Sequence, residues 1–185
     1  MDDLSLHILD IMENSVTAGA KMIGLEVREE TGKNRLIIQI KDDGKGMDKE
    51  TLTKVLDPFY TKKTVRRVGL GLSMLAQAAK EAGGSFKIDS ELGKGTNISA
   101  IFVYDHIDRK PLGNMAETIS AFIVGSGTEV DLIYRHHKNG NEFVFSSIEV
   151  KKILEGVAIN NPEVIAFLKD YIQGGLNEIS ERSRK

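Results

Sequence analysis

Three glycine-containing segments within the first hundred residues constrain the fold of this chain more than any other feature. They are Asp42-Asp43-Gly44-Lys45-Gly46-Met47, Val68-Gly69-Leu70-Gly71-Leu72-Ser73-Met74 and Gly93-Lys94-Gly95-Thr96. None has the G-x-x-x-x-G-K-S/T spacing of a P-loop, and Gly69-Leu70-Gly71 lacks the third glycine of a dinucleotide-binding fingerprint. An EF-hand is excluded as well, because placing Gly44 at its sixth loop position puts Gln39 where the first carboxylate belongs.

The pattern of apolar residues predicts helices and strands around these glycines. The expected helices of this part are residues 4–17, 49–56 and 70–82, and the expected strands are residues 21–30, 34–41, 85–90 and 96–104. The strands come in pairs between helices, which differs from the strict alternation of a Rossmann domain. We therefore expect an α+β fold with helices layered on one face of a mixed sheet.

A new set of expected helices and strands begins after Asp105. The elements expected there are helices at 115–124, 148–155 and 162–180, and a strand hairpin at 129–137 and 142–147. We therefore expect two units: residues 1–105 and a small appended α/β unit, residues 106–185. The adjacent pair His136-His137 does not predict a metal site, because neighbouring side chains in a strand point to opposite faces.

Composition excludes several classes of protein. The 185 residues carry a net charge of −2, contain no cysteine, and include no apolar run of the ~20 residues that a membrane span requires. Residues 1–105 hold 15 Lys+Arg against 16 Asp+Glu, so bulk charge does not predict a nucleic-acid binder. The start of the chain lacks the features of a secretory signal, so we expect a cytoplasmic protein.

Polar residues near the glycines fit the chemistry of a bound nucleotide. Asp10 and Asn14 are four residues apart and project from one side of the first helix. Mg²⁺ is held by few protein oxygens together with substrate phosphates, which suits Asn14, and Asp10 can orient water or act as a general base. The alternative is that both side chains simply face solvent.

The glycine loops can also contact a nucleotide, and they too have a purely structural alternative. Asp42 can accept a hydrogen bond from an exocyclic amine, while Gly44 and Gly46 let the backbone approach a flat base. Gly69 and Gly71 open a helix whose free amides favour phosphate, and four cations lie just upstream. Each loop taken alone is also a common turn or helix entry, so the nucleotide interpretation depends on their joint occurrence.

The segments together resemble the successive boxes of the GHKL ATPase superfamily, which includes gyrase, heat-shock chaperone ATPases, histidine kinases and MutL-type repair proteins. The segments that carry the resemblance, within residues 4–104, are the three glycine segments above, Glu13-Asn14-Ser15-Val16-Thr17-Ala18-Gly19-Ala20 and Asp57-Pro58-Phe59-Tyr60-Thr61-Lys62-Lys63. The resemblance implies a Bergerat fold, an α/β sandwich that binds ATP and magnesium beneath a flexible lid. The asparagine box is similar to MutL, whereas the short lid is similar to histidine kinases.

The same resemblance implies a role for each matching residue. Asn14 is the magnesium-associated asparagine, Asp42 binds adenine, and Asp10 stands where hydrolysing relatives have a glutamate base. The remaining nucleotide-binding positions it implies are Gly44, Gly46, Met47 and Thr96 near the base, Lys62 and Lys63 in the lid, and Gly69, Leu70, Gly71 and Leu72 at the phosphates. Because Asp10 is one methylene shorter than glutamate, and ~1 Å of misplacement costs ~100-fold in rate, binding is better supported than hydrolysis. Glu13 is a poorer base, since it points ~100° away from Asn14 around the helix.

Three functions are compatible with these residues. The leading hypothesis is a stand-alone, magnesium-dependent ATP-binding protein that uses nucleotide state to regulate or phosphorylate a protein partner through residues 106–185. Since only three residues precede Leu4, we do not expect the phosphoacceptor helices of a sensor histidine kinase. The second is a non-catalytic ATP-binding subunit that docks on an enzyme complex. The third, a MutL-like DNA clamp, is disfavoured by the short lid and the near-neutral charge. A homodimer is compatible with each of them, and neither a membrane nor a nucleic acid is an expected partner.

Overall fold

The computed structural model describes residues 3–55 and 70–184. Six strands form one mixed sheet in the order β3-β4-β2-β1-β5-β6. The strands are β1 (Met22–Glu30), β2 (Arg35–Asp42), β3 (Ser85–Glu91), β4 (Gly95–Val103), β5 (Asp131–Lys138) and β6 (Asn141–Ser146). The helices are α1 (Leu4–Thr17), α2 (Lys49–Lys54), α3 (Gly71–Glu81), α4 (Met115–Ser126), α5 (Ser147–Ile153) and α6 (Pro162–Arg182), and a short 3-10 turn, η1 (Thr31–Lys33), joins β1 to β2.

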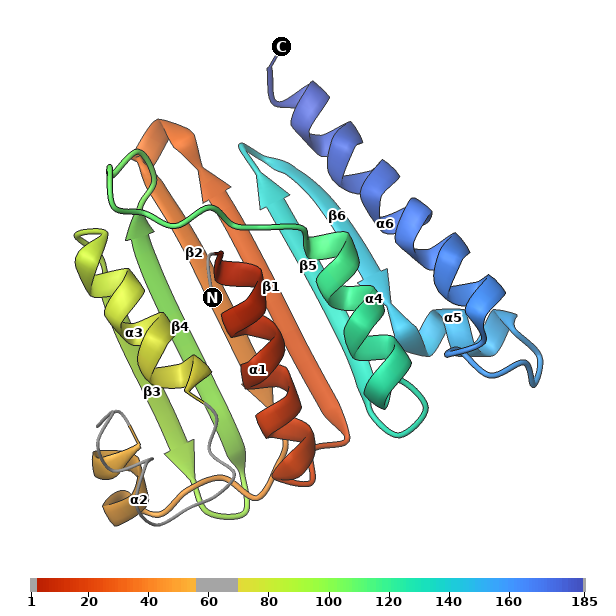
Figure 1. The fold of residues 1–185 in the computed structure, drawn as a ribbon, viewed down its shortest axis with the longest axis horizontal. Coiled ribbons are helices and arrows are strands. Elements are labelled where there is room, and N and C mark those ends of the chain that lie inside the picture. The colour runs from red at the N-terminus through yellow and green to blue at the C-terminus, as the bar shows by residue number, and fades with distance from the viewer. Residues whose placement is uncertain (1–2, 56–69, 185) are drawn as a thin grey trace.

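The main helices form a layer on one face of the sheet. Helices α3, α1 and α4 lie side by side, and α6 packs beside α4 and against β5 and β6 (Figure 1). Alternate strand residues point into the space between the layers, as a pleated strand requires. The inward residues of β1 and β2, each at most 1% exposed, are Ile23, Leu25, Val27, Leu36, Ile38 and Ile40. The expectation of an α+β fold with helices layered on one face of a mixed sheet is thereby confirmed.

Helix α1 lies at the centre of this layer, and its sequence both caps its start and buries one side. Asp3 precedes it and accepts a hydrogen bond from the Leu6 N–H at 3.2 Å. Leu4, Ile8 and Met12 are fully buried against the sheet and the neighbouring helices. The helix ends before Gly19, which has a positive φ of 80° that glycine adopts without strain.

The two parts of the chain that the sequence divides after residue 105 contribute to a single sheet. Strand β5 pairs with β1 in parallel, from Met22 opposite Asp131 to Glu29 opposite Lys138. All other neighbouring strands are antiparallel. The boundary expected after residue 105 lies between β4 and α4, and the later strands extend the same sheet at the edge of β1. No helix in the described ranges is both long enough and apolar enough to cross a membrane.

Candidate functional site

Most of the predicted nucleotide-binding residues within the described ranges lie at one end of the sheet. They come from α1, the end of β2, the loop after it, the start of β4 and the start of α3. Asp42 is the last residue of β2 and pairs across the strands with Ile23 and with Thr96. The structure thus places Asp42 and Thr96, which the resemblance assigns to the same end of the site, opposite each other on neighbouring strands.

Asp42 is buried and is held by two uncharged donors. Its side chain lies on the helix-facing side of β2, and the residue is only 7% exposed. The Ser15 hydroxyl donates to Oδ2 at 2.8 Å, and the Gly44 N–H donates to Oδ1 at 2.9 Å. Each carboxylate oxygen has two lone pairs, so both oxygens retain the capacity to accept one more hydrogen bond. Sequence reasoning missed Ser15, whose signal is its place one residue after Asn14 in the asparagine box.

The loop after β2 is fixed by backbone contacts. Asp43 accepts the Met22 and Lys21 N–H groups at 2.9 and 2.7 Å, and these hydrogen bonds hold the pKa of its carboxyl below the usual range. Lys45 N–H donates to the Ala18 carbonyl at 2.9 Å. Gly46 has a φ of 64°, and a Cβ there would lie 2.0 Å from the Glu91 carbonyl oxygen. Gly46 is therefore required for the loop to pack on the turn between β3 and β4.

Thr96 is connected to this loop through a residue that the sequence analysis did not single out. The Ser90 hydroxyl lies 2.9 Å from the Thr96 hydroxyl and accepts the Met47 N–H at 2.9 Å. It also donates to the Gly95 carbonyl at 3.0 Å. Ser90 thus links Met47 to Thr96, so both predicted residues belong to one hydrogen-bonded group.

Asp10 and Asn14 lie together on α1 and reach the start of α3. The Asn14 amide donates to Asp10 Oδ2 at 3.4 Å, and the same oxygen accepts the Gly71 N–H at 2.7 Å. A Cβ at Gly71 would lie 2.3 Å from that oxygen, so glycine is required there. The Gly71 N–H, which we expected to bind phosphate, donates to Asp10.

The remaining predicted residues divide into two groups. Leu70 is half exposed, whereas the Leu72 side chain is buried, so only the backbone of Leu72 can contact a ligand. Lys62, Lys63, Gly69 and the predicted lid with its Asp57-Pro58-Phe59-Tyr60 box lie outside the described residues.

His7 lies three residues before Asp10 on α1 and is fully buried. Neither ring nitrogen has a hydrogen-bond partner among the described residues. Burial, followed by the nearby positive charge of Lys110, lowers the pKa of this imidazole, so it is neutral at pH 7. His7 is therefore a buried neutral side chain beside the site.

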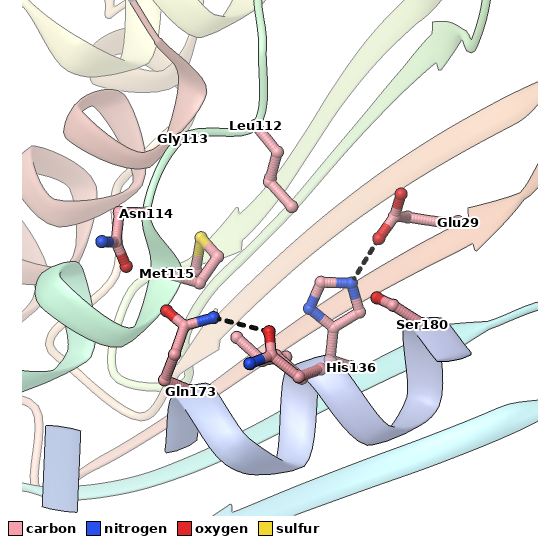
Figure 2. A pocket seen from close by; sticks show the side chains of 10 residues that line it. Glu29, Leu112, Gly113, Asn114, Met115, His136, Gln173 and Ser180 are labelled. Atoms are coloured by element: carbon pink, nitrogen blue, oxygen red, sulfur yellow. Dashed lines mark hydrogen bonds and ion pairs between the residues drawn. The ribbon is translucent and has the colours of Figure 1, made fainter. Parts of the chain in front are cut away.

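A second polar cluster lies at the other end of the sheet. Glu29 and His136 form the floor of a cavity of about 370 Å³ walled by the start of α4 and by α6, with Gln173 and Ser180 among its lining residues (Figure 2). Glu29 is six residues from Ile23 along β1, so this cavity lies about 20 Å from Asp42.

The hydrogen bonds of this cluster use both nitrogens of His136. Its Nε2 lies 2.8 Å from Glu29 Oε1, and its Nδ1 lies 2.6 Å from the Tyr134 hydroxyl. The Tyr104 hydroxyl donates to Glu29 Oε2 at 2.9 Å, and Lys138 Nζ lies 3.2 Å from the same oxygen. Since neither ring nitrogen is left to take a proton from a substrate, His136 is a structural group here.

Charge explains why Glu29 stays ionised. Burial alone would raise its pKa, but the hydrogen bond and charge of His136, with Lys138, outweigh burial and lower the pKa to about 2. Burial and the charge of Glu29 raise the pKa of Tyr134, which therefore stays protonated. His137 is half exposed on the opposite face and lies 2.9 Å from Glu26, and the described residues contain no group of three or more metal-binding side chains. The prediction that His136 and His137 point to opposite faces is confirmed.

Comparison with known families agrees with this geometry. Residues 2–106 match the family described as histidine kinase-, DNA gyrase B- and HSP90-like ATPase. That match covers more than half of the chain. The protein therefore belongs to this family of ATPases.

The curated relatives include bacterial kinases. The sensor kinase CckA of Brucella abortus is 37% identical over 87 residues, which make up 46% of this chain and 9% of CckA. Sporulation kinase C of Bacillus subtilis is 34% identical over 95 residues, which make up 51% of this chain and 22% of that kinase. This chain thus matches less than a quarter of the length of either kinase.

Solved structures share the fold over a longer stretch. The Aquifex aeolicus MutL ATPase domain complexed with ADP matches with a TM-score of 0.53 and 17% identity, over 84% of this chain and 68% of that one. The N-terminal domain of a DNA repair protein matches with a TM-score of 0.54 and 14% identity, over 79% of this chain and 53% of that one. At such low identity these likenesses show the fold alone, and they extend beyond the family match into the later part of the chain.

Proposed function

We propose that this protein binds ATP together with magnesium and uses its nucleotide state to regulate or phosphorylate a protein partner. The observation that carries the proposal is the buried Asp42 carboxylate, whose partners Ser15 and Gly44 are uncharged. A buried carboxylate without a cationic partner is costly, and it is commonly retained for binding or chemistry. An exocyclic amine of adenine is a donor of the kind that its remaining lone pairs accept.

The loop around Asp42 suits a flat base. Gly44 has no side chain, and a Cβ there would lie 3.0 Å from Asp42 Oδ1 and 3.1 Å from the Ala18 carbonyl oxygen. Met47 and Thr96 lie next to this loop through Ser90. We assign these residues to the adenine end of the site.

The donor set at Asn14 fits magnesium. The Asn14 Nδ2 group donates to Asp10, which sets the orientation of the amide and makes Oδ1 the atom for a metal. Bound magnesium would neutralise the negative charge of the phosphates there. Lys62 and Lys63, which the resemblance places in the lid, are assigned to the terminal phosphates.

Phosphoryl transfer needs mainly positioning and neutralisation of charge, which these residues can supply without a strong base. Residues 106–185 extend the same sheet and present α6 at its edge, so we assign partner binding to this part. Experiment must identify the partner and the side chain that accepts the phosphoryl group.

Calorimetry tests the proposal directly. Wild-type protein is titrated with ATP with and without magnesium, beside Asp42→Asn and a control, Asp89→Asn, on an exposed position of β3. We expect ATP binding that depends on magnesium. Asp42→Asn should weaken it at least tenfold, because the NH2 group of the new amide would face the adenine amine and both groups are donors. Asp89→Asn should leave the affinity unchanged. Absence of magnesium-dependent binding by the wild type overturns the proposal.

A non-catalytic ATP-binding subunit is the second candidate, favoured by the hydrogen bond from Gly71 that engages the Asp10 carboxylate. Turnover separates the two candidates. Measurable release or transfer of phosphate that depends on magnesium supports catalysis, whereas binding without turnover, with and without added partner, supports the second candidate.

A further inference from the structure

Helix α3 differs from the other α-helices of the described chain in how its start is capped. The residues before α1, α2, α4, α5 and α6 each accept a backbone N–H of their own first turn; they are Asp3, Asp48, Asn114, Ser146 and Asn161. Leu70 precedes α3, has no side-chain acceptor, and is followed by no acidic residue in the first turn. The start of α3 therefore needs an acceptor from elsewhere.

Asp10 supplies that acceptor from 61 residues earlier in the chain. Its Oδ2 atom lies 2.7 Å from the Gly71 nitrogen, a short hydrogen bond of the charge-assisted kind. Helices α1 and α3 pack side by side, so this bond ties one helix to the other (Figure 1). A carboxylate at the first turn also opposes the positive end of the helix dipole.

Asp10 and Gly71 are in close contact. A Cβ at Gly71 would lie 2.3 Å from Asp10 Oδ2 and 2.9 Å from its Cγ, so Gly71 is needed to admit this carboxylate. A glutamate at position 10 would place its carboxylate one methylene farther out, against the backbone of α3. The same Oδ2 atom also accepts the Asn14 amide, so one atom positions both α3 and Asn14.

We propose that Asp10 is a positioning residue that holds the first turn of α3 and the Asn14 amide in place, and that it does not take a proton from water. As far as it concerns ATP, this inference rests on the proposed function. Asp10 then occupies the Gly71 N–H, and the bound phosphates contact the other amides at the start of α3.

Hydrogen exchange of the Gly71 amide, followed by NMR without nucleotide, tests the contact itself. We expect Asp10→Ala to speed exchange at Gly71 at least tenfold, and Asp10→Asn to speed it less than about threefold, because an amide oxygen still accepts the bond. The control is Asn114→Ala, which removes the cap of α4, a helix of 12 residues against 11 for α3. It should leave Gly71 unchanged. Equal exchange at Gly71 in wild type and Asp10→Ala overturns the inference.

Affinity and turnover separate positioning from base catalysis. We expect Asp10→Ala to weaken magnesium-dependent ATP binding about tenfold, and Asp10→Asn to restore most of that affinity. If both variants bind ATP as the wild type does and both lose turnover equally, Asp10 acts as a base and the inference fails. Asp10→Asn keeps this test decisive where Asp10→Ala does not fold.

The two proposals fail in different ways. A wild-type protein that binds no ATP overturns the proposed function, while exchange at Gly71 still decides whether Asp10 caps α3. Conversely, normal ATP binding with unchanged exchange in Asp10→Ala overturns the capping role alone.

Discussion

Two carboxylates, the buried Asp42 and the partly buried Glu29, lie at opposite ends of the sheet and are held in different ways. Asp42 accepts hydrogen bonds from one hydroxyl and one backbone N–H. Glu29 lies against His136 and Lys138 and accepts a hydrogen bond from Tyr104. The partners of Glu29 neutralise and satisfy it, whereas those of Asp42 orient it and leave room for another donor.

This difference indicates different roles. Glu29 and its partners His136, Lys138 and Tyr104 form a structural cluster, which we call the clamp, whereas Asp42 is available to bind a ligand. Glu29 lies on β1, His136 on β5, and the Tyr104 side chain follows β4, so their hydrogen bonds hold together parts of the sheet that are distant in sequence. Asp42 holds only its own loop and α1. A change at Glu29 should therefore act on stability, and a change at Asp42 on ligand affinity.

Glu29→Ala should have the largest effect on stability. It leaves His136, Lys138 and the Tyr104 hydroxyl without their common acceptor, which costs about 3 kcal/mol of the free energy of unfolding. Urea denaturation measures this change. The control is Glu26→Ala on the same strand, whose carboxylate is paired at a more exposed position and should cost less than about 1 kcal/mol. Equal losses for the two variants would remove the distinction between clamp and surface pair.

The pH dependence of stability should show the same clamp. The pKa of Glu29 falls from 4.5 to about 2 on folding, so its contribution is complete above pH 4.5 and is lost as pH falls toward 2. The stability advantage of wild type over Glu29→Gln should shrink by up to about 3 kcal/mol across this window. Urea melts of both proteins between pH 6 and pH 2.5 measure it, and a constant difference would contradict the assignment.

Asp42→Asn should have the opposite balance of effects, with a small loss of stability and a large loss of ATP affinity. Its cost to stability should be about 1 kcal/mol, because an amide satisfies one of the two donors, Ser15 and Gly44, and opposes the other. Its main effect is the loss of ATP affinity described above. Thermal unfolding with and without ATP measures both quantities, and a stability loss as large as that of Glu29→Ala would make Asp42 a structural group as well.

Tyr104→Phe should have the smallest effect. It removes one hydroxyl donor from Glu29 while His136 and Lys138 remain, so the loss should be only about 0.5 kcal/mol. Burial, with the charge of Glu29 next, raises the pKa of Tyr104, so the hydroxyl is protonated over the whole range of the measurement. Urea denaturation beside an unchanged ATP affinity would place this residue in the clamp only.

Local sequence patterns predict most of the elements. The expected helix at residues 4–17 is observed as Leu4–Thr17, and that at 70–82 as Gly71–Glu81. The strands expected at 34–41 and 142–147 are each shifted by one residue at their start. Periodicity and glycine caps suffice here, because they depend on residues a few positions apart.

Contacts between distant segments could not be predicted in this way. The pairing of β1 with β5, and the bond from Gly71 to Asp10, join residues 109 and 61 positions apart. Glu29 carried a usable signal, since strand alternation puts it on the same face as Val27, where a charged residue needs a partner. The partner, His136, sits on the matching face of a strand that local patterns cannot place next to β1.

The parallel pairing of β1 with β5 has a consequence for synthesis of the chain. Met22 of β1 pairs with Asp131 of β5, so this edge of β1 has no partner strand until the ribosome has added more than a hundred further residues. An open apolar edge invites pairing with another nascent chain, and pairings over such separations form slowly. Aggregation during expression should therefore depend on how fast β5 and α4 arrive, and slowing translation between residues 105 and 131 should lower the yield of folded protein.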